Sequence, residues 1–133
     1  MAAGRYSFVI EQGATTDFEV VYQDSGSNPI SLANHQARMQ IRSTQDVTGT
    51  LILTLSSSLG ADGTGLNLSG SNGTTSIESG SIGVKISAHS SSLLDFTEAF
   101  YDLEISSGSS HPVVTRILEG KVQLSKNVTS GSF

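Results

Sequence analysis

Two acidic residues, two positions apart, carry the strongest hint of catalytic chemistry. Asp102 and Glu104 lie in the alternating segment 100–105, so on an extended strand their carboxylates would share one face about 6.5–7 Å apart. Carboxylate pairs at such a spacing serve glycoside hydrolysis as acid and base or nucleophile. The other interpretation is a solvated strand face on which a carboxylate pairs with Arg116. We favour the second, because the chain has no tryptophan to form a sugar platform.

Other catalytic and metal-binding patterns are missing from the sequence. His35, His89 and His111 are scattered over segments that we expect to be loops, and none has a second histidine or a carboxylate at metal-ligand spacing. No Gly-x-Ser-x-Gly motif is present, and the glycine-rich segment 60–65 lacks the Lys-Ser/Thr ending of a phosphate loop. We therefore expect no enzyme activity, no cofactor and no catalytic or metal site.

A single segment invites a calcium hypothesis. Asp62 begins the sequence Asp-Gly-Thr-Gly, and Asn67 follows shortly after. A calcium loop needs acidic residues at regular spacing and a closing glutamate, and this segment has neither. An ordinary turn is the interpretation we favour.

Composition sets the class of protein. The 133 residues suit one domain with one core, and only 14% of them are charged, so that serine, threonine, glycine and asparagine supply most of the polarity. This mixture is typical of a β protein with long loops. The net charge of −5 with seven basic residues excludes the basic stripe of a nucleic-acid binder. There is no cysteine, no apolar signal core and no membrane-length apolar run, so we expect a soluble protein made in a cytoplasm, without a membrane partner.

Alternating apolar residues predict the strands. We expect about seven or eight of them, folded as an all-β, antiparallel immunoglobulin-like sandwich. Residues 1–133 form the single domain, and 1–5 and 127–133 are expected to be flexible arms. Residues 56–81 are weakly patterned and predict a long mobile excursion, and 90–98 predict one helical turn capped by Ser92 with Asp95. The strands are expected at residues 6–11, 17–22, 37–42, 50–55, around 66–68, and at 82–86, 100–105 and 113–118, with the last one continuing through 120–124.

The last hairpin allows a residue pairing to be predicted. If Ile105 pairs with Val113, Asp102 falls directly opposite Arg116, an ion pair that stabilises by roughly 0.2–1 kcal/mol. On the other face Tyr101 then opposes Ile117, and Leu103 opposes Thr115.

Two further expectations concern this hairpin. Val122 and Leu124 have the parity of the outward Arg116, so we predict a one-residue bulge at Glu119–Gly120 that returns them to the core. Tyr101 either is a core aromatic residue or forms a tyrosine corner, in which its hydroxyl bonds back to the preceding corner of the chain.

One stripe of polar residues is a candidate docking site. Arg38, Gln40 and Arg42 point outward from a strand whose alternate residues point inward. They either dock an acidic protein surface or are ordinary solvated strand positions, and we lean to the second interpretation.

Several short segments, in this order, resemble a known class of proteins. They are 8–15, 30–32, 37–42, 101–105 and 116–122, followed by Val128 and Thr129. The set covers residues 6–129 and resembles small virion structural proteins of tailed bacteriophages with an immunoglobulin-like fold, most of all the N-terminal domain of baseplate upper proteins.

The resemblance implies a non-enzymatic assembly protein located in the virion. Such a protein would multimerise and contact other tail, baseplate or capsid subunits, with tail or baseplate as the first choice. Baseplate upper proteins continue into a fibre-like extension, whereas this chain stops at Phe133, which leaves a capsid decoration protein as the alternative.

A carbohydrate-binding module is the alternative of another class. It is disfavoured by the lack of tryptophan and by the inward parity of most phenylalanine and tyrosine residues. A small hydrolase comes third, because no nucleophile–base pair is present.

Overall fold

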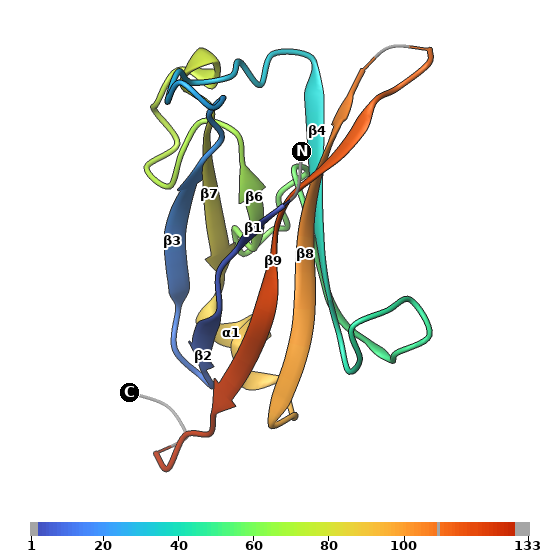
Figure 1. Ribbon diagram of the computed structural model, residues 1–133. Helices are drawn as coiled ribbons and strands as arrows, with labels where there is room; N and C mark the ends of the chain where they lie inside the picture. Colours follow the sequence, from blue (N-terminus) through green and yellow to red (C-terminus); the bar gives the residue numbers. More distant parts are fainter. Residues whose placement is uncertain (1–2, 109, 130–133) are drawn as a thin grey trace.

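Two β-sheets face each other in the computed structural model, which describes residues 3–108 and 110–129 (Figure 1). The all-β sandwich predicted from the alternating pattern is confirmed. The larger sheet consists of β1 (Gly4–Arg5), β2 (Phe8–Glu11), β4 (His35–Arg42), β5 (Leu51–Ser56), β8 (Glu98–Ser107) and β9 (Val114–Ser125). The smaller sheet consists of β3 (Thr16–Val21), β6 (Gly65–Asn67) and β7 (Ser81–Ile86). A 3-10 turn, Ile77–Ser79, and a short helix, α1 (Ala88–Ser92), connect the strands.

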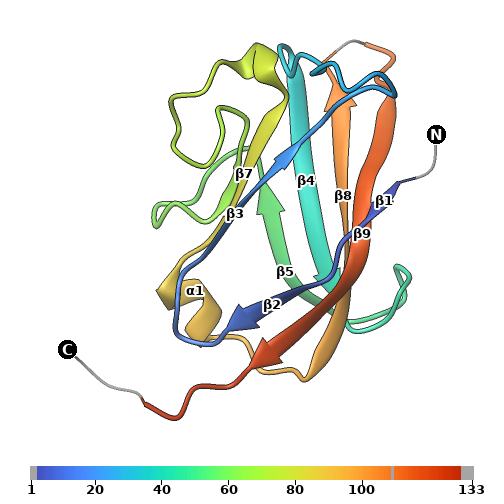
Figure 2. The same ribbon diagram turned by 60° about the vertical axis from the view of Figure 1, so that its left-hand side comes forward.

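The strand order shows one departure from the predicted antiparallel sandwich. The larger sheet has the order β1-β9-β8-β4-β5, with β2 also on β9, and the smaller sheet has the order β3-β7-β6. Both β1 and β2 run parallel to β9, while the other neighbours are antiparallel. The larger sheet is therefore mixed, because the first strands lie beside the last one before the chain crosses to the smaller sheet (Figure 2).

The core lies between the sheets and follows the predicted alternation. The inward residues of β2, β4 and β7 are buried, as the sequence predicts. Strand β5 is an exception: Leu51, predicted inward, is 46% exposed, because a register shift opposite Ile41 and Arg42 places it beside Arg42. The fully buried large apolar side chains are Ile10, Leu32, Met39, Ile41, Leu55, Leu66, Ile82, Val84, Ile86, Leu103 and Val122.

The helix begins earlier than the sequence suggested. Ser87, not Ser92, is the N-cap, and its hydroxyl accepts a hydrogen bond from the Ser90 amide at 3.0 Å. Ser92 is instead the last helical residue, and Asp95 pairs with Lys126 at 2.9 Å. The position of Ser87 directly after the buried strand β7 explains the start, since the helix turns the chain back as soon as the strand ends.

The predicted excursion at 56–81 is more ordered than expected. It contains β6 near the predicted position, with Leu66 fully buried, and its residues around Ser71 lie on the outer face of the smaller sheet. A Cβ atom at Gly83 would lie 2.6 Å from the Cα atom of Ser71, so this close packing requires a residue without a side chain at position 83.

The register of the final hairpin differs from the prediction by two residues near its loop. Ile105 pairs with Thr115 rather than with Val113, and Arg116 stands opposite Glu104 rather than opposite Asp102. Two more residues therefore lie between Ile105 and its partner on β9 than the prediction assumed. Within this connection, the Val113 amide bonds to the Ser107 hydroxyl at 2.9 Å.

The predicted bulge exists at another place. Arg116 pairs with Glu104 and Leu118 pairs with Leu103, so Ile117 is the extra residue, and pairing runs regularly through Gly120 opposite Tyr101. The physical requirement was correct, because the bulge returns Val122 and Leu124 to the core, but its location at Glu119–Gly120 was wrong.

Gly120 has a different role, which also involves Tyr101. A Cβ atom at position 120 would lie 2.1 Å from the carbonyl oxygen of Tyr6, so glycine allows the β1–β2 junction to approach β9 closely. The buried Tyr101 donates its hydroxyl hydrogen to that same oxygen at 2.5 Å. This long-range bond replaces the tyrosine-corner hypothesis, which is wrong, and burial raises the pKa of the Tyr101 hydroxyl.

The expected arms are only partly visible. Gly4 and Arg5 form β1 and pair with Leu118 and Glu119, so this part of the N-terminal segment is a strand. At the other end, the Asn127 amide donates to the Gln12 side chain at 3.2 Å. The rest of the expected arms, residues 1–2 and 130–133, lie outside the described residues.

Replacing Gly120 with alanine tests the close approach of the Tyr6 carbonyl to β9. We expect Gly120→Ala to lower the free energy of unfolding by about 1–3 kcal/mol, because the new methyl group pushes the Tyr6 carbonyl away. Urea denaturation measures the change. Gly4→Ala is the control, since a Cβ atom at position 4 makes only ordinary contacts at 3.6 Å. Equal stability of the Gly120→Ala protein and the wild type would contradict this close approach of the Tyr6 carbonyl to Gly120.

Candidate functional site

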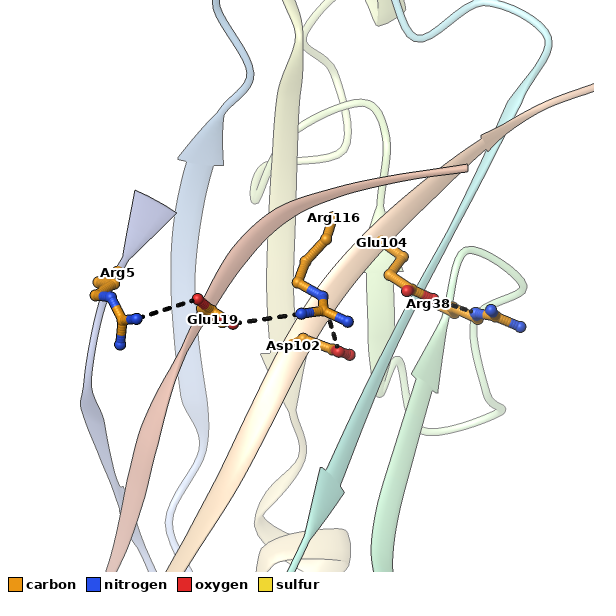
Figure 3. Close-up of polar contacts among 6 residues, drawn as sticks. All are labelled: Arg5, Arg38, Asp102, Glu104, Arg116 and Glu119. Atoms are coloured by element: carbon orange, nitrogen blue, oxygen red, sulfur yellow. Dashed lines mark hydrogen bonds and ion pairs between the residues drawn. The ribbon is translucent and has the colours of Figure 1, made fainter. Parts of the chain in front are cut away.

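The outer face of the larger sheet gathers most of the charge that the sequence singled out. All four arginines of the chain lie there, on β1, β4 and β9, together with three carboxylates from β8 and β9. Figure 3 shows Arg5, Arg38 and Arg116 with these carboxylates. We call this set the charged face: Arg5, Arg38, Arg42, Asp102, Glu104, Arg116 and Glu119.

Most of these charges pair with one another. The Arg38 Nε atom lies 2.8 Å from a Glu104 carboxylate oxygen, which joins β4 to β8. The Arg116 guanidinium lies 3.2 Å from Asp102 and 3.6 Å from Glu119. The predicted Asp102–Arg116 ion pair is thus confirmed, although the two residues are diagonal and not directly opposite.

The pairs form a ladder across four strands. Glu119 accepts both Arg116 and, at 3.6 Å, Arg5 of β1, so it links the last strand to the first. Surface ion pairs of this kind contribute little individually, and side-chain exposures of 51–76% at Arg5, Arg38 and Arg116 place these pairs in that class. Their arrangement therefore specifies strand neighbours more than it stabilises the fold.

The third arginine of the predicted docking stripe holds a loop. Arg42 donates to the carbonyl oxygen of Gly49 at 3.0 Å and to Gln40 at 3.0 Å, so it ties the loop between β4 and β5 to the sheet. The structure therefore gives Arg38, Gln40 and Arg42 partners within the chain. This favours the interpretation of solvated strand positions over a preformed docking stripe.

The charged face surrounds an open hollow of about 280 Å³. Within it, burial and the neighbouring Glu104 carboxylate raise the pKa of Asp102, an effect that Arg116 opposes. Among the described residues, no histidine, serine or cysteine lines the hollow. The lining residues are Arg38, Gln40, Arg42, Thr44, Gln45, Asp46, Val47, Phe100, Tyr101, Asp102, Glu104, Arg116 and Glu119.

The remaining candidate residues are not brought together. His35 begins β4 and His89 lies in α1, against the expectation of loops, while His111 lies in the hairpin loop. Among residues 3–108 and 110–129, no group of three histidine, aspartate or glutamate side chains is placed to hold a metal ion. In the same part of the chain, no helix is long and apolar enough to cross a membrane.

The segment considered for calcium is a hydrogen-bonded turn. The Asp62 carboxylate accepts bonds from the Ser87 hydroxyl at 2.5 Å, the Ser90 hydroxyl at 2.8 Å and the Thr64 amide at 3.0 Å. These bonds, led by the one from Ser87, lower the pKa of Asp62. The carboxylate thus fastens the loop to the start of α1, a role that the spacing of Asp62 and Ser87 in the sequence does not reveal.

The comparisons with known proteins add no identity. No protein-family model matches the chain, and no curated protein matches its sequence.

The pH dependence of stability separates Asp102 from an ordinary surface carboxylate. Its pKa is raised on folding, so the native state binds the proton more tightly, and stability is lost as the pH rises from the unfolded value through the folded one. The free energy of unfolding of Asp102→Asn, relative to wild type, should therefore rise with pH across this range. We expect a change of less than about 1 kcal/mol, because the side chain is 37% exposed.

Asp95→Asn is the matched control for this experiment. The hydrogen bond from Lys126 lowers the pKa of Asp95, so its stabilising effect is present above the unfolded pKa and lost as the pH falls through the folded value. Relative to wild type, the stability of this variant should fall as the pH rises. Urea denaturation at several pH values measures the free energy of unfolding of both variants. If this free energy, relative to wild type, changed with pH in the same direction for both, the opposite pKa shifts of Asp102 and Asp95 would be contradicted.

Proposed function

We propose that the chain is a non-enzymatic structural protein of a tailed-phage virion, in the tail or baseplate, where it assembles as a multimer. The observation that carries the proposal is where the resembling segments lie in the fold. Segments 37–42, 101–105 and 116–122, and residues 8–11 of segment 8–15, lie in β4, β8, β9 and β2, which are neighbours in one sheet, whereas 30–32 and 128–129 lie outside these strands. Most of the resemblance therefore concerns one sheet of the molecule.

The strand order supports the immunoglobulin-like part of the proposal. The orders β9-β8-β4-β5 and β3-β7-β6 correspond to the G-F-C-C′ and B-E-D orders of variable-type immunoglobulin sheets. The chain departs from antibody domains in lacking the disulfide and the tryptophan of their core. The disulfide and the tryptophan are features of antibody domains, and many other proteins share the sandwich architecture without sequence similarity to them.

The chemistry of the charged face favours scaffolding over catalysis. Its carboxylates face arginines at 2.8–3.6 Å, and none of the described residues that line the hollow is a histidine, serine or cysteine. An inverting or retaining glycosidase needs one free carboxylic acid and one free carboxylate at the scissile bond. Asp102 and Glu104 are both engaged with guanidinium groups, so they serve the sheet.

Quantitative mass spectrometry of purified phage particles tests the proposal. We expect the chain in the particle at on the order of six copies or a small multiple, because a tail or baseplate ring imposes cyclic symmetry. Hundreds of copies would move it to the capsid as a decoration protein, or to the tail tube. Absence from purified particles would overturn the assignment to the virion.

A further inference from the structure

We propose that the free edge of β3 binds an extended segment of a neighbouring protein in which apolar residues alternate with lysine or arginine. The segment would add a fourth strand to the smaller sheet. Strand β3 is the outermost strand of that sheet, at the left of Figure 1, and it pairs with β7 on one side only.

The backbone of β3 is ready for such a strand. The Tyr22 amide, one residue beyond β3, donates to the Gly80 carbonyl in the register that continues the β3–β7 ladder. Because hydrogen-bonded residues alternate along an antiparallel pair, Phe18 and Val20 bond to β7 as well. The amides and carbonyls of the intervening Asp17, Glu19 and Val21 therefore point to the open edge, and no described residue bonds to them.

The apolar side of this edge is incompletely covered. Phe18 and Val20 point inward but are only half-buried. Tyr6, from the β1–β2 junction, lies with its ring centroid 5.6 Å from that of Phe18 and is 46% exposed. An added strand would place its inward side chains over these rings, and apolar residues at alternate positions would remove them from water.

Charge selects the outward residues of the partner. Asp17 and Glu19 project from the outer side of β3, and Val21 beside them is 45% exposed. Asp17 has no ion pair in the described part of the chain, although Lys85 is its register partner on β7. Glu19 accepts one hydrogen bond, from the Ser71 amide at 3.1 Å. Lysine or arginine directly across from these carboxylates is favoured, whereas a second copy of β3 would oppose acid with acid.

The sheet edges at β6, β1 and β5 are less suitable. Strand β6 has three residues, and Gly65 is packed so closely that a Cβ atom there would lie 2.7 Å from the Ser56 carbonyl. Strand β1 has two residues. Strand β5 is six residues long but carries no acidic side chain, so it offers nothing that selects a basic partner.

The inference deepens the proposed assembly role and depends on it only for the partner being a virion subunit. A peptide experiment with the isolated protein tests the edge, whereas mass spectrometry of particles tests the assignment to the virion. A failed peptide experiment would reject binding at the β3 edge, whereas absence of the chain from particles would reject only the assignment to the virion.

The experiment is amide hydrogen exchange by NMR with a capped six-residue peptide of alternating lysine and valine. In the free protein, we expect fast exchange at Asp17, Glu19 and Val21 and slow exchange at Phe18 and Val20. Peptide at ten times its dissociation constant should slow the three fast amides about tenfold. A peptide of alternating glutamate and valine should leave them unchanged.

Variants decide whether the protection arises at β3. Val21→Pro removes an edge amide that does not bond to β7, so the protein should fold and lose the protection. Asp17→Lys should weaken binding of the lysine peptide, while Glu11→Lys, the same charge change on β2, should not. Protection of β5 amides instead of β3, equal binding of the acidic peptide, or no protection at millimolar peptide would each overturn the proposal.

Discussion

The close approach of the β1–β2 junction to β9 is the constraint on which the larger sheet depends. The Tyr6 carbonyl lies where a side chain at Gly120 would be, and the Tyr101 hydroxyl, from β8, bonds to that carbonyl. The N-terminal segment and the final β8–β9 hairpin, which lie at opposite ends of the sequence, therefore meet at one oxygen atom. Because β2 continues directly into the turn before β3, this meeting point also fixes where the chain passes from one sheet to the other.

The extra residue in β9 solves a second problem of the same strand. The half near the hairpin loop must point Arg116 outward toward Asp102, while the other half must point Val122 and Leu124 into the core. A regular strand cannot satisfy both, because side chains alternate with a period of two. The bulge at Ile117 shifts the parity between them, so β9 serves the charged face with one half and the core with the other.

Much of this organisation was predictable from the sequence, because alternation reports directly which face a residue occupies. The inward residues of β2, β4 and β7 and the need for a bulge in β9 are examples. The location of the bulge was not predictable, since Ile117 is an ordinary strand residue and the competing signal at Gly120 reflects contact with Tyr6, more than a hundred positions away. Long-range contacts of this kind leave no trace in local spacing.

The candidate site also combines features that the alternation of residues predicts with features that depend on long-range contacts. The outward positions of Arg38, Asp102 and Arg116 followed from parity, whereas the pairing of Arg38 with Glu104 depends on the order of β4, β8 and β9 in the sheet. The helix start at Ser87 and the fastening of Asp62 to it were missed for the same reason, since their partners lie 25 residues apart. The edge of β3 could not be recognised without the sheet order, because an edge is a property of neighbours.

These features describe a protein whose charged side chains are largely used internally and whose backbone edge remains available. We infer that the chain joins neighbouring subunits through that edge. Zero-length carboxylate-to-lysine cross-linking of intact phage particles, read by mass spectrometry, tests it most directly. We expect links from Asp17 or Glu19 to lysines of another subunit. Links from these two residues only to lysines of the same chain, in particles that contain the protein, would contradict it.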